Sequence, residues 1–235
     1  MNKKRTQIIA LIPAKKNSQD LKNKNIKKLN NLSLFELAIL SAKKSKNINK
    51  VYLSSDSNEI LKKGKKYKIN LIKRNKSLCK NSTSANEVIL DFIKNYIKDD
   101  LANSIIVYLQ PTSPFRNNMH VDLAINIFIK KKLRSILSVT ENKNFYKSLK
   151  KNKNVLSPFF NNKYITNNRQ NLDKIYSPNG AIYIFYTSDF VKKKKLTFTK
   201  SGYYLMSRIE SIDIDDKQDY ELAKFLSKKY LKIKK

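Results

Sequence analysis

The sequence predicts an α/β protein, a three-layer sandwich in which helices cover both faces of a mostly parallel sheet. Short apolar runs alternate with amphipathic segments along the chain. The runs are apolar throughout, which is typical of strands buried on both faces. Strands that alternate with helices at this spacing are joined by right-handed crossovers. We expect strands at residues 7–12, 51–54, 69–72, 105–109, 135–139 and 181–186.

Two helix starts carry a specific signal. Ser33-Leu34-Phe35-Glu36 and Ser84-Ala85-Asn86-Glu87 both fit the capping box, in which a serine and a glutamate three residues later bond each other's backbone. They open helices expected at 34–46 and 85–98. Further helices are expected at 57–67, 118–131 and 217–230.

The chain length and one irregular segment set the domain organisation. With 235 residues the chain can bury one sizeable core, so we expect a single domain over residues 1–235. Residues 141–178 interrupt the alternation and are rich in Asn, Lys and aromatic residues. These aromatic side chains need something to pack on, so the segment is interpreted as an insertion, either a lid or a dimer arm. They are Phe145, Tyr146, Phe159, Phe160 and Tyr164.

The charge is strongly basic but is not patterned for nucleic acid. The formal net charge is +32, yet only six of the 50 basic residues are arginine, and the lysines are spread over every segment. A nucleic-acid binder tends to concentrate its charge and to use arginine for bidentate contacts. We therefore expect solvated lysine faces and no nucleic-acid partner. A basic nucleic-acid-binding module is kept as the alternative class.

Other residue types exclude further classes. A single cysteine, Cys79, excludes a disulfide framework and a multi-cysteine zinc site, and favours a reducing compartment. No apolar run approaches the length of about 18 residues that spans a membrane, so we expect a cytoplasmic protein with no membrane partner. The only histidine, His120, is expected to cap a helix or face solvent. A Ser/His/Asp triad is therefore disfavoured.

The first candidate site loop follows the first strand, where ligands bind in doubly wound sheets. Residues 13–25 carry lysines together with Asn17, Ser18 and Asn25, and contain neither GxGxxG nor GxxxxGK. Asparagine can adopt the left-handed conformations that glycine usually supplies, so a phosphate-binding turn remains open. An ordinary lysine-rich loop is the alternative.

The second candidate is the stretch SIDIDD. Asp213 and Asp215 are two residues apart, so on an extended chain both carboxylates point the same way. Mg²⁺ is typically held by one or two carboxylates plus substrate phosphate oxygens. A compatible alternative is that Asp215 or Asp216 caps the helix that begins near Lys217.

Two further loops are polar in a patterned way. Residues 106–116 read IVYLQPTSPFR, in which a buried strand runs into a loop stiffened by two prolines. The rigid loop is expected to present Gln110, Thr112, Ser113 and Arg116 at little ordering cost. Residues 177–185 read SPNGAIYIF, a turn leading into a strand.

Four stretches in this order resemble the motifs of the cytidylyltransferases that activate acylneuraminate (sialic acid) and related nonulosonates. They are IPAKKNSQDLKNKNI, LQPTSPFR, SPNGAIYI and MSRIESIDID, and the resemblance covers roughly residues 7–226. It implies a Rossmann-like homodimer that joins CTP and a 2-keto sugar acid, with Mg²⁺, into the CMP-sugar and pyrophosphate. An enzyme acting on 3-deoxy-octulosonate is the alternative within this class.

The resemblance also implies roles for individual residues. Lys24 is expected to be catalytic, and Asp213 and Asp215 to be catalytic and to hold the metal. The nucleotide is expected to contact Lys15, Asn17, Ser18, Lys24, Asn25, Arg74, Ser82, Thr83 and Ala85. The acceptor sugar is expected to contact Gln110, Arg169, Asn179 and Tyr183, with Arg169 pairing with its carboxylate.

Three departures from the family pattern concern both substrates. Lys15 stands where the family usually has arginine, which keeps the charge and loses the bidentate fork. Asp20-Leu21-Lys22 replaces the usual Gly-Leu-Pro. Leu196-Thr197-Phe198 replaces an aromatic pair of sialate-specific relatives, so the acceptor pocket is expected to differ in shape, and legionaminate-like or pseudaminate-like acids remain open.

Overall fold

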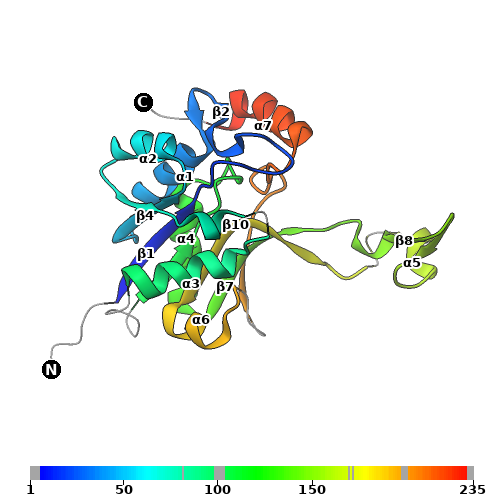
Figure 1. Cartoon of the computed structure of the whole chain (residues 1–235). Coiled ribbons are helices and arrows are strands. Elements are labelled where there is room, and N and C mark those ends of the chain that lie inside the picture. The colour runs from blue at the N-terminus through cyan, green and yellow to red at the C-terminus, as the bar shows by residue number, and fades with distance from the viewer. Residues whose placement is uncertain are drawn as a thin grey trace.

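The core of the protein is one seven-stranded sheet with helices on both faces. The computed structural model describes residues 6–80, 82–97, 104–168, 170, 172–196 and 201–231. The strand order is β11-β7-β10-β6-β1-β4-β5, and only β10 runs antiparallel to its neighbours. The strands are β1 (Gln7–Pro13), β4 (Lys50–Ser55), β5 (Asn70–Lys73), β6 (Ser104–Tyr108), β7 (Ser135–Glu141), β10 (Tyr176–Tyr186) and β11 (Gly202–Leu205). The predicted mostly parallel α/β sandwich is confirmed (Figure 1).

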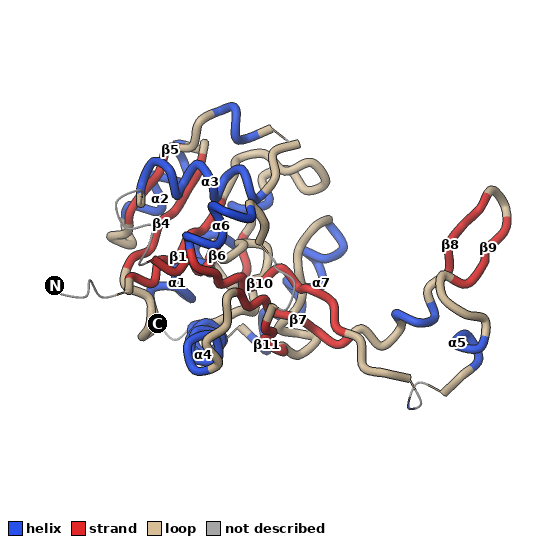
Figure 2. The backbone as a smooth tube through the Cα atoms, turned by 90° about the horizontal axis from the view of Figure 1, so that it is seen from below, coloured by secondary structure: helices blue, strands red, loops and turns tan. Residues whose placement is uncertain are grey.

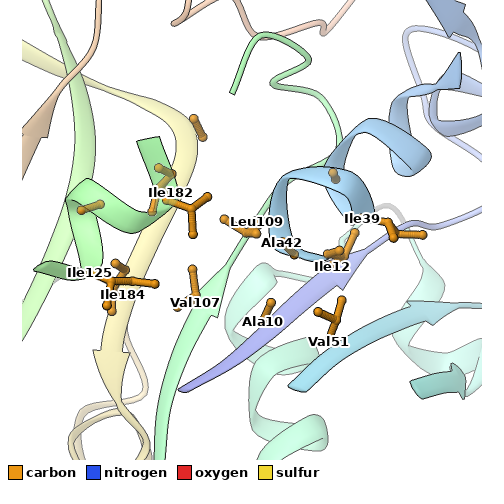
Figure 3. Packing of buried hydrophobic residues seen from close by; sticks show 14 of the residues in the cluster. Ala10, Ile12, Ile39, Ala42, Val51, Val107, Leu109, Ile125, Ile182 and Ile184 are labelled. Atoms are coloured by element: carbon orange, nitrogen blue, oxygen red, sulfur yellow. The ribbon is translucent and has the colours of Figure 1, made fainter. Parts of the chain in front are cut away.

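Strand β1 shows why these strands are apolar on both sides. Ile8, Ala10 and Ile12 point into one hydrophobic cluster, whereas Ile9 and Leu11 point into the other. Helices α1 (Leu34–Lys43), α2 (Asn58–Lys65) and α4 (Asn118–Lys130) complete the first cluster. Figure 3 shows side chains of this cluster from β1, β4, β6 and β10 together with those of α1 and α4. Helices α3 (Ala85–Tyr96) and α6 (Thr187–Lys193) complete the second cluster. Alternation along one strand therefore fills two cores.

The predicted helices are present with small changes in their ends. They are α1 (Leu34–Lys43), α2 (Asn58–Lys65), α3 (Ala85–Tyr96), α4 (Asn118–Lys130) and α7 (Lys217–Tyr230). Both capping boxes are confirmed: Glu36 Oε2 accepts the Ser33 N–H at 2.9 Å, and Glu87 Oε2 accepts the Ser84 N–H at 2.7 Å. The short elements α6 (Thr187–Lys193) and β11 were not expected from the sequence. Each offers too few residues for a periodic signal.

Small elements shape the loops at the sheet edge. A two-stranded hairpin, β2 (Lys28–Leu29) and β3 (Leu32–Ser33), lies under α7, whose Tyr220 hydroxyl donates to the Lys28 carbonyl at 2.8 Å. Two 3₁₀ turns, η1 (Lys24–Ile26) and η2 (Lys76–Cys79), follow the loops after β1 and β5. Among the described residues no helix is both long and apolar enough to cross a membrane.

The chain between β7 and β10 leaves the sheet and projects from the body, as Figures 1 and 2 show from two sides. We call residues 142–175 the arm. It carries η4 (Phe145–Lys147), the hairpin of β8 (Leu149–Asn152) and β9 (Val155–Pro158), and α5 (Lys163–Thr166). The predicted insertion at 141–178 is slightly longer, since Glu141 belongs to β7 and residues 176–178 to β10.

The aromatic side chains of the arm pack on one another. The Phe160 ring centroid lies 4.8 Å from that of Phe145 and 5.7 Å from that of Tyr146. Tyr146 in turn lies 4.9 Å from Tyr164. None of these rings belongs to the three buried clusters of the body. The arm therefore has a small aromatic cluster of its own.

Candidate active site

A cavity of about 340 Å³ opens at the carboxyl ends of β1, β5 and β6. This is the edge at which a doubly wound sheet binds ligands. Four separate stretches of chain meet there: the loop after β1, the segment after β5, the loop after β6, and residues 213–215. The predicted residues that line it are Lys15, Ser18, Lys24, Asn25, Arg74, Thr83, Ala85, Gln110, Asp213 and Asp215.

The loop after β1 is fixed by hydrogen bonds between side chains and its backbone. Asn25 is buried, and its Nδ2 donates to the Lys15 carbonyl at 2.8 Å, which closes the loop on itself. Asp56, at the end of β4, accepts the Lys16 N–H at 2.7 Å. The left-handed conformation expected of an asparagine occurs at Asn23 (φ 57°). Asn17 is exposed and is not among the residues that line the cavity.

The opposite wall comes from the segment after β5. Arg74 is 5% exposed; its Nε donates to Ser54 Oγ at 3.1 Å and its Nη2 to the Ser54 carbonyl at 2.8 Å. Thr83 and Ala85 line the cavity beside it, at the start of α3. Ser82 is exposed and does not line the cavity. Buried Arg74 thus supplies a fixed positive charge to this wall.

Asp213 and Asp215 both reach the cavity, as their spacing predicts, but their environments differ. Burial raises the pKa of the Asp213 carboxyl, while a hydrogen bond from Thr112 and the Lys24 charge act in the opposite direction. Asp213 Oδ1 is buried with no hydrogen-bond partner among the described residues. Asp215 is exposed, and its Oδ1 accepts from Lys24 Nζ at 3.1 Å.

Of the two aspartates expected as possible helix caps, Asp216 and not Asp215 caps α7. Asp216 is the N-cap of α7, and its Oδ1 accepts the Asp219 N–H at 2.9 Å. Asp219 returns the contact by accepting the backbone N–H groups of Asp215 and Asp216. The carboxylate of Asp215 is therefore not used for capping and remains directed to Lys24 and the cavity.

Gly180 explains how tightly the centre of the site is packed. Its φ of +75° is a conformation that side chains disfavour. A Cβ atom there would lie 2.8 Å from Gln110 Oε1 and 2.9 Å from Asp213 Oδ2. Any larger residue would displace both groups. The Asn179-Gly180 pair is therefore more than a turn signal, because it lets Gln110 and Asp213 approach each other.

The residues expected to contact the acceptor sugar are not all found at the cavity. Asn179 is 6% exposed; its Nδ2 donates to Ser211 Oγ at 2.8 Å and its Oδ1 accepts the Ala181 N–H, so it holds chain segments together and does not line the cavity. Tyr183 packs against Tyr108 with ring centroids 6.4 Å apart, and burial raises the pKa of its hydroxyl. Arg169, Thr197 and Phe198 lie outside the described residues.

The expectation that the loop after β6 presents Arg116 and Ser113 was wrong. Arg116 is not presented by the loop after β6: it is 3% exposed, and its Nη1 donates to the carbonyls of Gln110 and Ala181, both at 2.8 Å. Burial lowers the pKa of Arg116 to about 9, and nearby Asp213 opposes that shift. Ser113 is likewise buried. Buried carbonyl groups need a hydrogen-bond donor. Arg116 supplies it here, and its two hydrogen bonds hold the loop rigid.

The expected capping role of His120 is confirmed. Its Nδ1 accepts the Asn117 N–H at 3.3 Å, and the side chain is buried. Thr112 lines the cavity, as expected of this loop, whereas Lys80 and Tyr108 are cavity residues that the sequence did not indicate. Nothing in the sequence distinguishes Lys80 from the many other lysines, and Tyr108 fits the apolar pattern of a buried strand.

The donor set fits a magnesium ion held together with a substrate. Asp213 and Asp215 line the cavity, as does Asp20 of the loop after β1, and Asp213 Oδ1 has an unused acceptor site. Among the described residues no group of three or more His, Cys, Asp or Glu side chains could hold a metal by itself. Mg²⁺ is commonly bound by one or two carboxylates and completes its coordination with phosphate oxygens and water.

A parallel sheet with cationic loops and paired carboxylates at its carboxyl edge is the architecture of a nucleotide-handling enzyme. Comparison with known proteins makes the class specific. The family model described as cytidylyltransferase matches residues 9–234. The chain belongs to the cytidylyltransferase family.

Curated relatives are similar over almost all of this chain. N-acylneuraminate cytidylyltransferase of Escherichia coli is 32% identical over 228 residues, which are 93% of this chain and 52% of the relative. Flagellin modification protein B of Campylobacter coli is 29% identical over 95% of this chain and 96% of its own. CMP-N,N'-diacetyllegionaminic acid synthase of Legionella pneumophila is 27% identical over 94% and 96%. The chain thus spans about half the length of the first relative and nearly all of the other two.

Solved structures share the fold at low identity. CMP:2-keto-3-deoxy-manno-octonic acid synthetase, complexed with CTP, superposes with a TM-score of 0.69 at 10% identity and covers 95% of this chain and 99% of its own. A 4-diphosphocytidyl-2C-methyl-D-erythritol synthase from Anaerococcus prevotii gives a TM-score of 0.64 at 16% identity, covering 95% and 99%. These likenesses confirm the Rossmann-like fold of the nucleotidyltransferases.

Proposed function

We propose that this chain transfers CMP from CTP to a nonulosonic, sialic-acid-like 2-keto sugar acid and releases pyrophosphate. The observation that carries the proposal is the meeting of Lys24, Asp213 and Gln110 in one cavity, from three separate loops. Relatives named for N-acylneuraminate and legionaminate support the acceptor class. A basic nucleic-acid-binding module has no comparable support, since Lys24 in this cavity pairs with the Asp215 carboxylate.

The reaction requires a hydroxyl of the acid to attack the α-phosphorus while pyrophosphate leaves in line. Lys15, Lys24 and Arg74 carry positive charge into the cavity from two walls and would neutralise the triphosphate. Gln110, beside Asp213 across Gly180, would orient the acceptor. No histidine base is needed, because the charge of the transition state spreads over phosphate oxygens that positioned cations stabilise.

Magnesium is part of this proposal. Asp213 and Asp215 would hold the ion, which when bound neutralises phosphate charge and can acidify the attacking hydroxyl. Lys24 bonds Asp215, so the loop after β1 and the carboxylates are linked before any ligand arrives. The chain's own contribution is to keep these charges in place, which lowers the reorganisation that the reaction would otherwise require.

The base is proposed to be cytosine, bound near Arg74, Thr83 and Ala85. A site that hydrogen-bonds a base edge rejects analogues that leave its buried groups unpaired. Pyrophosphate release should therefore favour CTP over UTP, ATP and GTP by roughly a hundredfold. Equal turnover with UTP would refute the assignment of this wall to the base.

The acceptor is proposed to be a nonulosonate, with 3-deoxy-octulosonate as the alternative. Pyrophosphate release should be measured with sialic, legionaminic, pseudaminic and 3-deoxy-octulosonic acids at fixed CTP. We expect turnover with at least one nine-carbon acid and less with the eight-carbon acid. The reverse ranking would favour the alternative. We further propose a cytoplasmic homodimer that associates through the arm, whose exposed apolar residues include Val155, Leu156 and Phe159.

A further inference from the structure

The segment that brings Asp213 to the cavity begins with a tight turn at residues 207–211. Ser207 donates its N–H to Glu210 Oε2 at 2.9 Å, and the Ser211 N–H donates to the Ser207 carbonyl at 3.0 Å. One carboxylate oxygen of Glu210 therefore closes the turn. Its other oxygen, Oε1, lies 3.2 Å from Nε2 of His120 on α4.

The contacts of His120 fix its tautomer. Its Nδ1 accepts the Asn117 N–H, so in the neutral ring the proton sits on Nε2 and is donated to Glu210. The ring is held further by the His120 N–H, which donates to Asn117 Oδ1 at 3.1 Å. Burial lowers the pKa of His120, the Glu210 carboxylate raises it and the Arg116 charge lowers it, while the Tyr204 ring lies 6.2 Å away on β11. Both ring nitrogens are used, and His120 does not line the cavity.

The turn is anchored at only a few further points before Asp213. Asn179 Nδ2 donates to Ser211 Oγ at 2.8 Å. Beyond Asp213, the Ile214 N–H donates to the Thr112 carbonyl at 2.9 Å. The His120–Glu210 contact is the anchor that ties the turn to α4, an element that does not contribute to the cavity lining.

We propose that His120 and Glu210 are positioning residues for Asp213: their contact fixes the 207–211 turn, and the turn fixes the direction of the Asp213 carboxylate. The inference rests on the proposed function for its catalytic readout. Its structural part, the ordering of residues 207–214, is independent of which reaction the chain performs. It also gives a role to the only histidine of the chain, which is buried and does not line the cavity.

The test uses His120→Ala, Glu210→Ala and the double variant in the full chain. Because the two side chains act through one contact, we expect each single variant to lower kcat about tenfold and the double variant to lower it no further. The KM for CTP should change less than about twofold, since the walls that hold the nucleotide are untouched. Glu210→Gln, whose Oε1 can still accept from His120, should recover part of the loss.

Asp122→Asn is the matched control. Asp122 lies on the same helix, and its Oδ1 accepts from Ser45 Oγ at 2.6 Å and from the Lys46 N–H at 3.0 Å, away from the turn. It should lower thermal stability without changing kcat. Equal loss of kcat in the control would mean that general destabilisation of α4 explains the effect, and would overturn the proposal.

Hydrogen exchange supplies a readout that needs no activity. Amides of residues 207–214 should exchange about tenfold faster in Glu210→Ala than in the wild type, and at wild-type rates in Asp122→Asn. Unchanged exchange in Glu210→Ala, or a double variant whose kcat loss is the product of the two single losses, would contradict the positioning role of His120 and Glu210. If the wild-type chain released no pyrophosphate with any acid, the proposed function would fail, while the exchange result would still decide whether the His120–Glu210 contact orders the turn.

Discussion

The cavity edge of the sheet and the arm are stabilised in different ways. At the cavity edge, buried polar groups such as Arg74, Arg116 and Asn179 are held by several hydrogen bonds each. In the arm, Phe159 and Leu156 are 60% and 62% exposed and the aromatic rings contact mainly one another. The site geometry is therefore set within the body, whereas the arm offers apolar surface that the body does not cover.

Matched phenylalanines test this contrast with the largest expected effect on stability. Phe92 is 2% exposed in the body core, so Phe92→Ala should lower the free energy of unfolding by about 3 to 5 kcal/mol. Phe160 is 40% exposed in the arm, and Phe160→Ala should leave the thermal unfolding of the body almost unchanged. Calorimetry compares the two. Equal losses would mean that arm and body unfold as one packed unit.

The next largest effect concerns the carboxylates. Asp213→Asn keeps the shape of the side chain but removes a negative charge from the cavity, so kcat/KM should fall by roughly 10² to 10³ and the Mg²⁺ concentration needed should rise. Asp215→Asn should act in the same direction. Asp216→Asn is the control, because asparagine and aspartate cap helices about equally well. Unchanged activity and Mg²⁺ dependence in both Asp213→Asn and Asp215→Asn would exclude a metal site here.

Lys24 and Lys22 separate a placed charge from a general one. The Lys24 side chain is 13% exposed and bonds Asp215, whereas Lys22 is exposed on the same loop. Lys24→Ala should lower kcat/KM by about a hundredfold, on the scale of a lost transition-state contact, and Lys22→Ala should have little effect. Steady-state kinetics at fixed ionic strength provides the comparison, and similar losses in both variants would indicate generic charge.

Much of this architecture was predictable from local pattern. Capping boxes, apolar runs and the order of the polar loops determine the sheet and place Lys24, Gln110 and Asp213 together. The family resemblance singled out Lys24, but residue type alone does not separate two lysines of one loop; in the fold the Lys24 side chain is 13% exposed and Lys22 is exposed. Arg116 misled for a related reason: a polar residue in a loop reads as exposed, although here it bonds the carbonyls of two segments that are distant in sequence.

Glu36 gives a smaller effect that depends on pH. Burial alone would raise the pKa of Glu36, but hydrogen bonds from Lys66, Ser33 and Tyr67 outweigh it and lower the pKa from 4.5 to about 2. A depressed pKa stabilises the fold above the unfolded value, so this contribution is complete above about pH 5 and is lost as the pH falls from 4.5 towards 2. It amounts to roughly 2 to 3 kcal/mol at neutral pH.

Urea unfolding of Glu36→Gln at several pH values measures this pH-dependent contribution of Glu36 to stability. The variant should be less stable than the wild type at pH 7, and the difference should shrink below pH 4. Glu59→Gln is the control, since Glu59 pairs with Lys63 on an exposed helix surface and should not alter the unfolding curve. A difference between Glu36→Gln and wild type that does not change with pH would contradict the assigned cause.

The central claim is that this cavity joins CMP to a nonulosonic acid. Phosphorus NMR of the chain with CTP, Mg²⁺ and each acid of the panel follows every phosphorus-containing species at once. With a matching acid, we expect CTP to be consumed and pyrophosphate and a CMP ester of the acid to accumulate in equal amounts. Consumption of CTP without the ester, or no consumption with any acid of the panel, would contradict it.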